Sequence, residues 1–399
     1  MRQKIPAAIT GMGCICGVGG TLGECIETLF EGRRNPLPPL RFTSTHAIRY
    51  PVFEVPEAAI RPELKNTDHI SLTSKLAITA AYEAFIDSGL EIHEVKGKKV
   101  GVCIGTTVGS VMNNLPFYTE FHKGGTPEIG AINRFLRSNP SALIAREFGL
   151  TGPCQTVVNA CSSSTDAIGI GASWIQSGLC EMVIAGGADE LSLVTYNGFI
   201  SMMIADENPC KPFDRDRKGL NLGEGSAILI LESEHSWVQR HKTPRAIVLG
   251  YGSSSDAHHL TAPHPHGEGL KRALIEAMSF SGAEPDEIAF VNAHGTGTPD
   301  NDRVESKVLS ELLPDVPFVS TKGYTGHTLG AAGAIEAAFT VACLERSMIP
   351  GSAGFANPDP DLLATPAKTP TVVKGSMAIS QSLAFGGCNG VLIIGNRGG

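Results

Sequence analysis

Short runs of apolar residues rich in Val, Ile and Ala recur along the chain, as in strands that are buried on both faces of a sheet. They lie at residues 7–13, 98–107, 180–190, 225–233, 246–252, 286–298 and 389–396. Between them, 73–90 and 268–283 have the composition of helices, and in the first of these Ala77, Ala81, Ala84 and Phe85 fall on one face, with Gly89 at the C-cap. Strands that alternate with helices in this way predict an α/β fold.

Two of these runs resemble each other. "AAITGMG" (7–13) and "AIVLGYG" (246–252) are both apolar runs that end in Gly-x-Gly. The runs at 98–107 and 286–298 both lead into a loop of small residues. The pattern predicts duplicated α/β layers, with an N-terminal half over 1–240 and a C-terminal half over 241–399.

Composition narrows the class of protein. The chain has 399 residues, of which 42% are hydrophobic and 18% charged, as expected of a globular protein with a large core. The net charge of −8 argues against nucleic acid as the main partner. No run of 18 apolar residues is present, so we expect no membrane span. Glycines interrupt the apolar N-terminus, which therefore favours a strand over a signal peptide.

Ten cysteines form no regular framework, and we expect reduced thiols in a cytosolic protein. There is no CxxC pair, and Cys14 and Cys16 form only a CxC, too little to predict a metal site. Cys161 differs from the rest. In "VVNACSSSTDAIGIGAS" (157–173), two β-branched residues precede it and a serine-rich helix start follows. This thiol is either a small buried hydrophobe or a nucleophile whose pKa the helix N-terminus and nearby imidazoles lower by about one unit or more.

Two loops of the second half carry further candidate chemistry. His294 stands among small residues in "NAHGTGTPDND" (292–302), and a histidine hydrogen-bonded within a turn is the simplest interpretation of it alone. Lys322 and His327 lie in "STKGYTGHTLGAAGAIEAA" (320–338), which opens a helix of very small residues. Taken together, one Cys and two His suit carbon–carbon bond formation, since the thiolate can carry an acyl group while two imidazoles stabilise an enolate. A hydrolase would instead need one His base with an Asn or Asp that orients it.

Several motifs, in order and over nearly the whole chain, resemble those of the β-ketoacyl-acyl carrier protein synthases, the condensing enzymes of the thiolase superfamily. They are "ITGMG", "ACSSS", "KPFDRDRKGLNLGEGSAILILE", "SSDAHHLTAP", "NAHGTGTP", "TKGYTGHTLGAAGA" and "FGGCNG". The order Cys, His, Lys, His is similar to that of the elongating branch. The resemblance implies a thiolase fold of five layers, αβαβα, acting as a dimer.

The resemblance also implies roles for single residues. Cys161 would accept the acyl group, and His294 and His327 would bind the malonyl thioester carbonyl. Lys322 would position the site electrostatically, paired with Glu336. The N–H groups of Cys161 and Phe385 would form the oxyanion hole, and Phe385, with Gly386 and Gly387 after it, would gate the acyl pocket.

The implied reaction is decarboxylative Claisen condensation in fatty-acid or type II polyketide or polyene elongation, with no metal and no cofactor beyond the phosphopantetheine of the acyl carrier protein. Two features depart from the family pattern: Leu383 and Ala384 replace Phe and Gly of the gating loop, and Cys388 replaces Thr. We expect basic residues to dock the acidic carrier; the candidates are Arg61, Lys65, Arg215 and Arg217. "HPHG" (264–267) is interpreted as a surface loop.

Three alternatives stay open: a ketosynthase of secondary metabolism, a thioester hydrolase using Cys161, and one subunit of a ketosynthase pair that has a Cys-less homologous partner.

Overall fold

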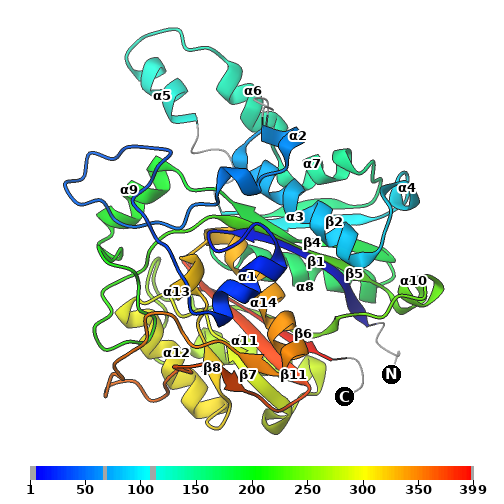
Figure 1. Cartoon of the computed structure of the whole chain (residues 1–399), viewed down its shortest axis with the longest axis vertical. Helices are drawn as coiled ribbons and strands as arrows, with labels where there is room; N and C mark the ends of the chain where they lie inside the picture. The colour runs from blue at the N-terminus through cyan, green and yellow to red at the C-terminus, as the bar shows by residue number, and fades with distance from the viewer. Residues whose placement is uncertain (1–5, 66–69, 108–113, 397–399) are drawn as a thin grey trace.

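The computed structural model describes residues 6–65, 70–107 and 114–396. A ten-stranded mixed sheet runs through it in the order β3-β2-β4-β5-β1-β6-β12-β11-β7-β8, and a small sheet pairs β9 with β10 (Figure 1). The strands are β1 (Ala7–Cys16), β2 (Gly101–Gly105), β3 (Cys154–Val157), β4 (Met182–Asp189), β5 (Gly225–Glu232), β6 (Ala246–Ser255), β7 (Ile288–Asn292), β8 (Phe318–Val319), β9 (Met348–Ile349), β10 (Thr371–Val372), β11 (Met377–Ala384) and β12 (Cys388–Gly395).

The longer helices are α1 (Leu22–Phe30), α3 (Leu72–Ser88), α5 (Leu115–His122), α6 (Gly130–Arg137), α7 (Pro140–Glu147), α8 (Ser163–Gln176), α9 (Leu193–Ser201), α11 (Glu268–Ser281), α12 (Pro299–Leu312) and α14 (Ala332–Arg346). Shorter ones are α2 (Pro62–Lys65), α4 (Ile92–Val95), α10 (Glu234–Gln239) and α13 (Lys322–Thr325). The predicted helices at 73–90 and 268–283 are α3 and α11, and Gly89 caps α3 in the left-handed conformation, φ 69°. Among the described residues, no helix is long and apolar enough to cross a membrane.

The two halves of the large sheet repeat one topology. In each half the outer two pairings are parallel and the inner two antiparallel: β3-β2-β4-β5-β1 in one, and β8-β7-β11-β12-β6 in the other. The halves join where β1 pairs with β6 over Ala7–Ile9. This duplication is the one predicted from the repeated apolar runs. The division at residues 240 and 241 stays a prediction.

Helices fill three layers around the two half-sheets. α3 packs on the outer face of β1 and β5, α11 packs on β6 and β12, and α8 and α14 contact each other between the halves (Figure 1). The middle layer is the most deeply buried, since α14 is buried from Ala332 through Leu344. The predicted five-layer αβαβα thiolase architecture is confirmed.

The repeated Gly-x-Gly has a packing reason. A Cβ on Gly13 would lie 2.1 Å from the carbonyl oxygen of Ala80 in α3, and a Cβ on Gly252 would lie 2.0 Å from that of Ala273 in α11. Only glycine allows the outer helices to approach the first strand of each half so closely.

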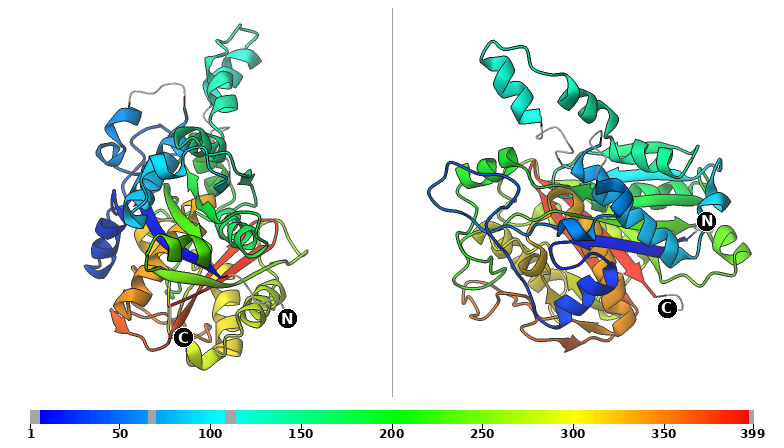
Figure 2. Two further views of the ribbon diagram at one scale, coloured as in Figure 1. Left: turned by 90° about the vertical axis from the view of Figure 1, so that its right-hand side faces the viewer. Right: turned by 45° about the horizontal axis from the view of Figure 1, so that its top comes forward.

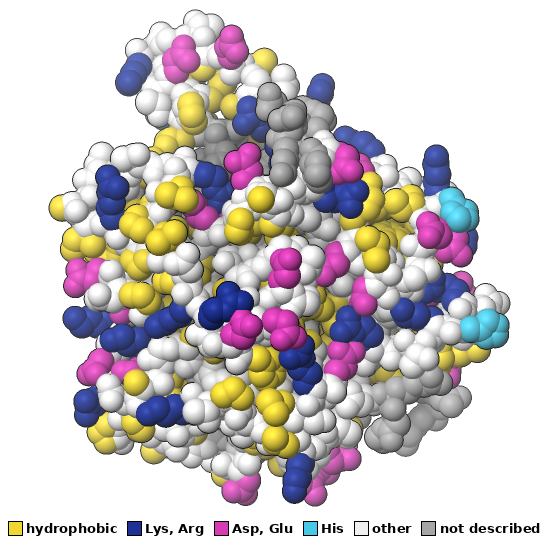
Figure 3. Space-filling view, in the orientation of Figure 1, with side chains coloured by type: hydrophobic (Ala, Val, Ile, Leu, Met, Phe, Trp, Pro, Cys, Tyr) yellow, Lys and Arg dark blue, Asp and Glu magenta, His cyan; other side chains and the backbone are white. Residues whose placement is uncertain are grey.

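An arm made of α5 and α6 stands away from the layered body, as the three ribbon views agree (Figures 1 and 2). Its helices expose large apolar side chains: Phe121 is 61% exposed and Leu136 is 69% exposed. Figure 3 shows apolar surface on the arm among side chains of both charges. The arm therefore offers apolar surface that the layered body does not cover.

Candidate active site

One pocket with a volume of about 320 Å³ brings together residues from both halves of the fold. Cys161, His294, His327 and Phe385 all line it. They come from the turn before α8, the loop after β7, the loop after α13 and the β11–β12 turn. The structure thus gathers the predicted Cys and both predicted His at one place, although up to 166 residues separate them in the sequence.

Cys161 lies on a tight turn between β3 and α8. The residue before it, Ala160, has φ 48°, a left-handed conformation that costs energy for any residue with a Cβ. Serine hydroxyls hold the turn: Ser163 Oγ accepts from the N–H of Asn159 at 2.8 Å and donates to the carbonyl of Ala160 at 2.6 Å. The serines after Cys161 therefore fix the strand-to-helix turn that places the thiol directly before the start of α8.

The protonation state of Cys161 differs from the expectation. Burial raises the pKa of its thiol to about 12, although Lys322 and the backbone N–H of Phe385, which donates to the sulfur, both lower it. The predicted lowering of the Cys161 pKa is wrong, because loss of water around the buried sulfur outweighs the nearby positive groups. The resting group is a thiol, so acylation must include removal of its proton.

His327 is buried and its ring orientation is fixed. Its Nδ1 accepts a hydrogen bond from the backbone N–H of Leu329 at 3.1 Å. Since Nδ1 is the acceptor, the proton of the neutral ring is on Nε2. Burial, together with the charge of Lys322, holds the pKa of His327 well below its ordinary value, so the ring is neutral.

His294 has the same arrangement through a different donor. Lys322 Nζ lies 3.0 Å from its Nδ1, so that nitrogen accepts and Nε2 again carries the proton. Burial, Lys322 and His327 hold the pKa of His294 well below its ordinary value. The two rings lie 5.2 Å apart, centre to centre, at 84°. The pocket therefore presents two neutral imidazoles, each with an Nε2–H donor.

Lys322 is 1% exposed and forms a buried ion pair with Glu336 of α14, as predicted. Burial raises the pKa of the Glu336 carboxyl, while Lys322 opposes the change. Lys322 Nζ thus contacts both a carboxylate and the imidazole of His294. In this position its charge holds one tautomer of His294 and disfavours the imidazolium.

The predicted gate is the turn between β11 and β12. Phe385 is half-buried, and its ring stacks on Phe199 of α9 at 5.6 Å. Gly386 and Gly387 follow with φ 84° and 78°, values that favour glycine. Ala384 has no positive φ and ends β11, so the alanine that replaces the family's glycine fits this conformation without strain.

The four predicted docking residues have different surroundings. Arg61 stacks on the ring of Tyr82, and Arg215 is exposed. The side chain of Lys65 lies outside the described residues. Arg217 is only 7% exposed and pairs with Asp302 and Asp359, so it is no surface charge. Its prediction as a docking residue is wrong, because its charge ties its own loop to α12 and to the loop that carries Asp359.

Sequence reasoning missed three residues that support or line the pocket. Glu305 of α12 accepts hydrogen bonds from the N–H groups of His294 and Gly295, at 2.5 and 2.7 Å, and so holds the His294 loop. Asp189 at the end of β4 accepts from the N–H of Gly330 at 2.7 Å. Lys218 is exposed and lines the pocket. A buried Glu about two turns into α12, a helix with many polar residues, gives no sequence signal of its own.

Family models and known proteins agree with this geometry. The model "Beta-ketoacyl synthase, N-terminal domain" matches residues 5–236, and "Beta-ketoacyl synthase, C-terminal domain" matches 245–356. The chain is 33% identical to 3-oxoacyl-[acyl-carrier-protein] synthase 2 of Synechocystis, with 97% of each chain covered. It is also 33% identical to nodulation protein E of Rhizobium meliloti, over 96% of this chain and 97% of that one.

Solved structures give the same result. The ishigamide ketosynthase/chain length factor superposes with a TM-score of 0.92 at 30% identity, over 99% of this chain and all of that one. A ketosynthase in complex with its chain length factor, from Xenorhabdus doucetiae, gives 0.83 at 30% identity, with 98% of each chain covered. The chain belongs to the beta-ketoacyl synthase family.

Proposed function

We propose that this protein is an elongating β-ketoacyl-acyl carrier protein synthase, which joins an enzyme-bound acyl group to malonyl-acyl carrier protein with loss of CO₂. The observation that carries the proposal is the pair of neutral imidazoles, His294 and His327, that line one pocket with Cys161. Two Nε2–H donors suit a thioester carbonyl that gains negative charge during the reaction.

The first half-reaction loads the enzyme. The Cys161 sulfur attacks the carbonyl of the acyl thioester, and its proton leaves with the carrier's thiol. The N–H of Phe385, which donates to the Cys161 sulfur, is placed to stabilise the oxyanion that forms beside it. The new bond is a thioester on Cys161.

The second half-reaction extends the chain. The malonyl thioester carbonyl accepts hydrogen bonds from His294 and His327, CO₂ leaves, and the electron pair of the broken C–C bond remains as an enolate. The enolate carbon attacks the thioester carbonyl on Cys161. The Cys161–acyl bond then breaks, the leaving thiolate takes up a proton from solvent to regenerate the thiol, and the β-ketoacyl product stays on the carrier protein.

The environment of the imidazoles argues against the thioester hydrolase. A base that activates water would need a carboxylate or amide oxygen at its Nδ1, to stabilise the imidazolium. Here His327 Nδ1 meets an N–H donor, and His294 Nδ1 meets the ammonium of Lys322. Both contacts favour imidazoles that donate a hydrogen bond through Nε2–H, and they disfavour imidazoles that take up a proton as a base.

The pocket entrance supports a carrier-bound substrate. Lys218 is exposed at the pocket, and Arg215 lies exposed three residues before it. We infer that these cations face the acidic carrier and its phosphopantetheine phosphate, with Arg61 and Lys65 as further candidates.

The apolar arm supports a dimer, either with a second copy or with a homologous chain such as a chain length factor. The cysteines of the described region are all free, which supports a cytoplasmic location.

The deciding experiment incubates the protein with a panel of acyl-carrier thioesters and then with malonyl-carrier protein. Intact-mass measurement is expected to show one acyl group on Cys161, absent in Cys161→Ala. Product analysis is expected to show β-ketoacyl-carrier protein. Free fatty acid as the main product would establish the hydrolase instead, and acylation of Cys161→Ala would show that another residue is the nucleophile.

A further inference from the structure

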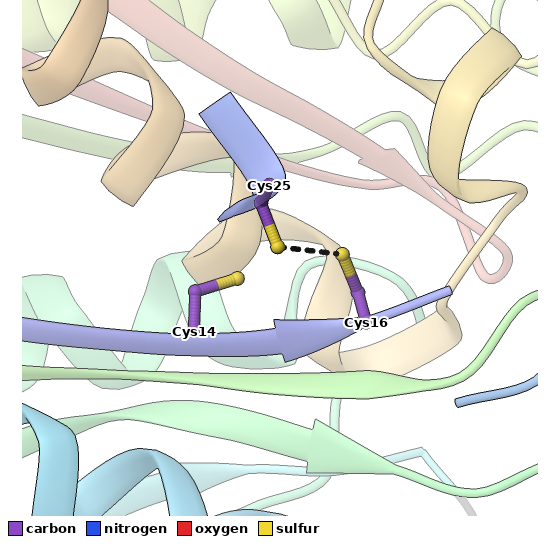
Figure 4. Close-up of side chains that lie close together, drawn as sticks. All are labelled: Cys14, Cys16 and Cys25. Carbon is purple, nitrogen blue, oxygen red and sulfur yellow. Dashed lines mark hydrogen bonds between the residues drawn. The ribbon is translucent and has the colours of Figure 1, made fainter. Parts of the chain in front are cut away.

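Three buried cysteine thiols meet at a place that the proposed reaction does not use. Cys14 and Cys16 are alternate residues of β1, so their side chains lie on the same face, and Cys25 comes from the first turns of α1 (Figure 4). The Sγ atoms of Cys16 and Cys25 are 3.5 Å apart, and all three sulfurs lie within 4.8 Å of one another. All three side chains are 0% exposed, and none of them lines the pocket that holds Cys161.

We propose that Cys14, Cys16 and Cys25 form a binding site for a soft monovalent cation, Cu(I), in three-coordinate sulfur geometry. Three sulfurs at about 2.3 Å from a central metal, the usual metal–thiolate distance, would lie about 4 Å apart. The observed spacing of 3.5 to 4.8 Å needs only small shifts to reach this value.

The ligand set selects the metal. Thiolates are soft ligands that prefer Cu(I), Zn(II) or iron–sulfur clusters. Structural Zn(II) is almost always four-coordinate, and no fourth His, Cys, Asp or Glu joins the three thiols within the described part of the chain. Because the cluster is also shut off from solvent, water is poorly placed to complete a tetrahedron. Cu(I) is satisfied by three sulfurs.

The chain around the cluster is shaped to hold the sulfurs together. The N–H and C=O groups of Cys16 and Gly19 bond each other at 3.0 and 3.2 Å and close a tight turn. A Cβ on Gly19 would lie 2.9 Å from the Cys25 sulfur. This turn lets α1 begin close enough to β1 for Cys25 to reach Cys16.

A groove beside the cluster offers a path for the metal. Leu22, Gly23 and Ile26 of α1 line it together with Glu83, whose carboxylate accepts from the N–H of Cys14 at 2.8 Å. Small motions of α1 would open the cluster toward this groove. Each thiol that becomes a ligand releases its proton to solvent, with no change of oxidation state at sulfur or copper.

The test is an anaerobic Cu(I) titration in competition with bathocuproine disulfonate. It uses the full chain with Cys161→Ala, which removes the thiol that lies near two imidazoles. One equivalent of Cu(I) is expected to be retained, with three Cu–S contacts in X-ray absorption and a raised melting temperature. Cys16→Ala and Cys25→Ala should weaken binding by more than the ~10-fold that loss of an outer-shell partner costs.

Cys103→Ala is the matched control, since Cys103 is a 0% exposed strand thiol outside the cluster, and it should bind Cu(I) like the parent. Cys25→Ser keeps the size of the side chain and separates loss of a ligand from misfolding, which melting curves of the metal-free proteins also monitor. Binding that is unchanged in the Cys16 and Cys25 variants, no retained Cu(I), nitrogen or oxygen ligands in the absorption data, or tighter four-coordinate Zn(II) would each overturn the proposal.

Discussion

At the scale of single residues, the group beside each imidazole Nδ1 determines what that imidazole can do. In both cases a hydrogen-bond donor lies beside Nδ1: the N–H of Leu329 for His327, and the Lys322 ammonium for His294. Both rings are therefore kept as neutral donors at Nε2. The pair resembles an oxyanion hole made of side chains more than it resembles a pair of bases.

The two half-reactions can be separated at these residues. Cys161→Gln is expected to lose condensation but to retain decarboxylation of malonyl-carrier protein, because its amide mimics the acylated thiol while both Nε2–H donors remain. Adding His327→Ala should reduce CO₂ release by about 10²–10³-fold, the usual cost of one oxyanion donor. Release of labelled CO₂ measures both variants. Undiminished release from the double variant would contradict the role given to His327.

The lowered histidine pKa values predict a particular pH profile for the same decarboxylation. A histidine with its ordinary pKa would be half protonated near pH 6.5, whereas these rings, whose pKa values lie well below that, keep their neutral form as the pH falls through it. The rate of Cys161→Gln should therefore stay flat from pH 8 to about 6.

Glu336 provides the control for that profile, because burial raises its pKa toward the same range. If a step appears near pH 7 and Glu336→Gln removes it, the step belongs to the Lys322–Glu336 pair. A step near pH 6.5 that remains in Glu336→Gln would contradict the neutral-imidazole model.

A site residue can be predicted from the sequence when the residues next to it form a recognisable motif. Cys161, His294 and His327 sit in motifs dense with Gly and Ser, so the loops themselves are conspicuous. Glu305 holds the His294 loop from inside α12, where Glu is an ordinary helix residue, and only the fold brings the two together. The raised pKa of Cys161 was equally hidden, because it depends on burial by segments distant in sequence.

At the scale of elements, the close contact of strand and helix is the same in both halves. Gly13→Ala and Gly252→Ala should each destabilise the protein by about 1–3 kcal/mol, since the new methyl group would overlap a helix carbonyl. Denaturant unfolding measures the change. Gly130→Ala is the control, because its Cβ would meet nothing within 4 Å, and it should be neutral or stabilising. A neutral effect at both strand positions would contradict the packing argument.

Apolar runs revealed most strands of the large sheet but not β3, β11 or the two-residue β8. β11 carries Ser380, Gln381 and Ser382, a polar stretch that reads as a loop. Those side chains are nevertheless buried, because Gln381 donates to Glu305 at 2.6 Å and Ser382 bonds Thr165 at 2.8 Å. β3 is a four-residue edge strand that is partly exposed, so it lacks the apolar signal of a buried strand.

At the scale of the whole molecule, the arm of α5 and α6 exposes apolar side chains that the layered body does not cover. We expect a second chain of the same fold to cover it, since Phe121 and Leu136 are largely exposed. Light scattering should report a dimer, and Phe121→Asp should shift it toward monomer. Lys123→Asp, on the same arm, controls for added negative charge and should remain dimeric. An unchanged dimer in Phe121→Asp would place the interface elsewhere.

The pairing of β1 with β6 and the contact of α8 with α14 have a consequence for assembly. Each half contains a complete five-stranded unit, yet Cys161 belongs to one half and both histidines to the other. A chain divided after residue 240 would give two fragments, each with one apolar helix of the middle layer laid bare. Each fragment produced alone should be catalytically inactive and prone to aggregation. When the two fragments are produced together, activity should return only if they associate. Measuring condensation activity would therefore detect their association.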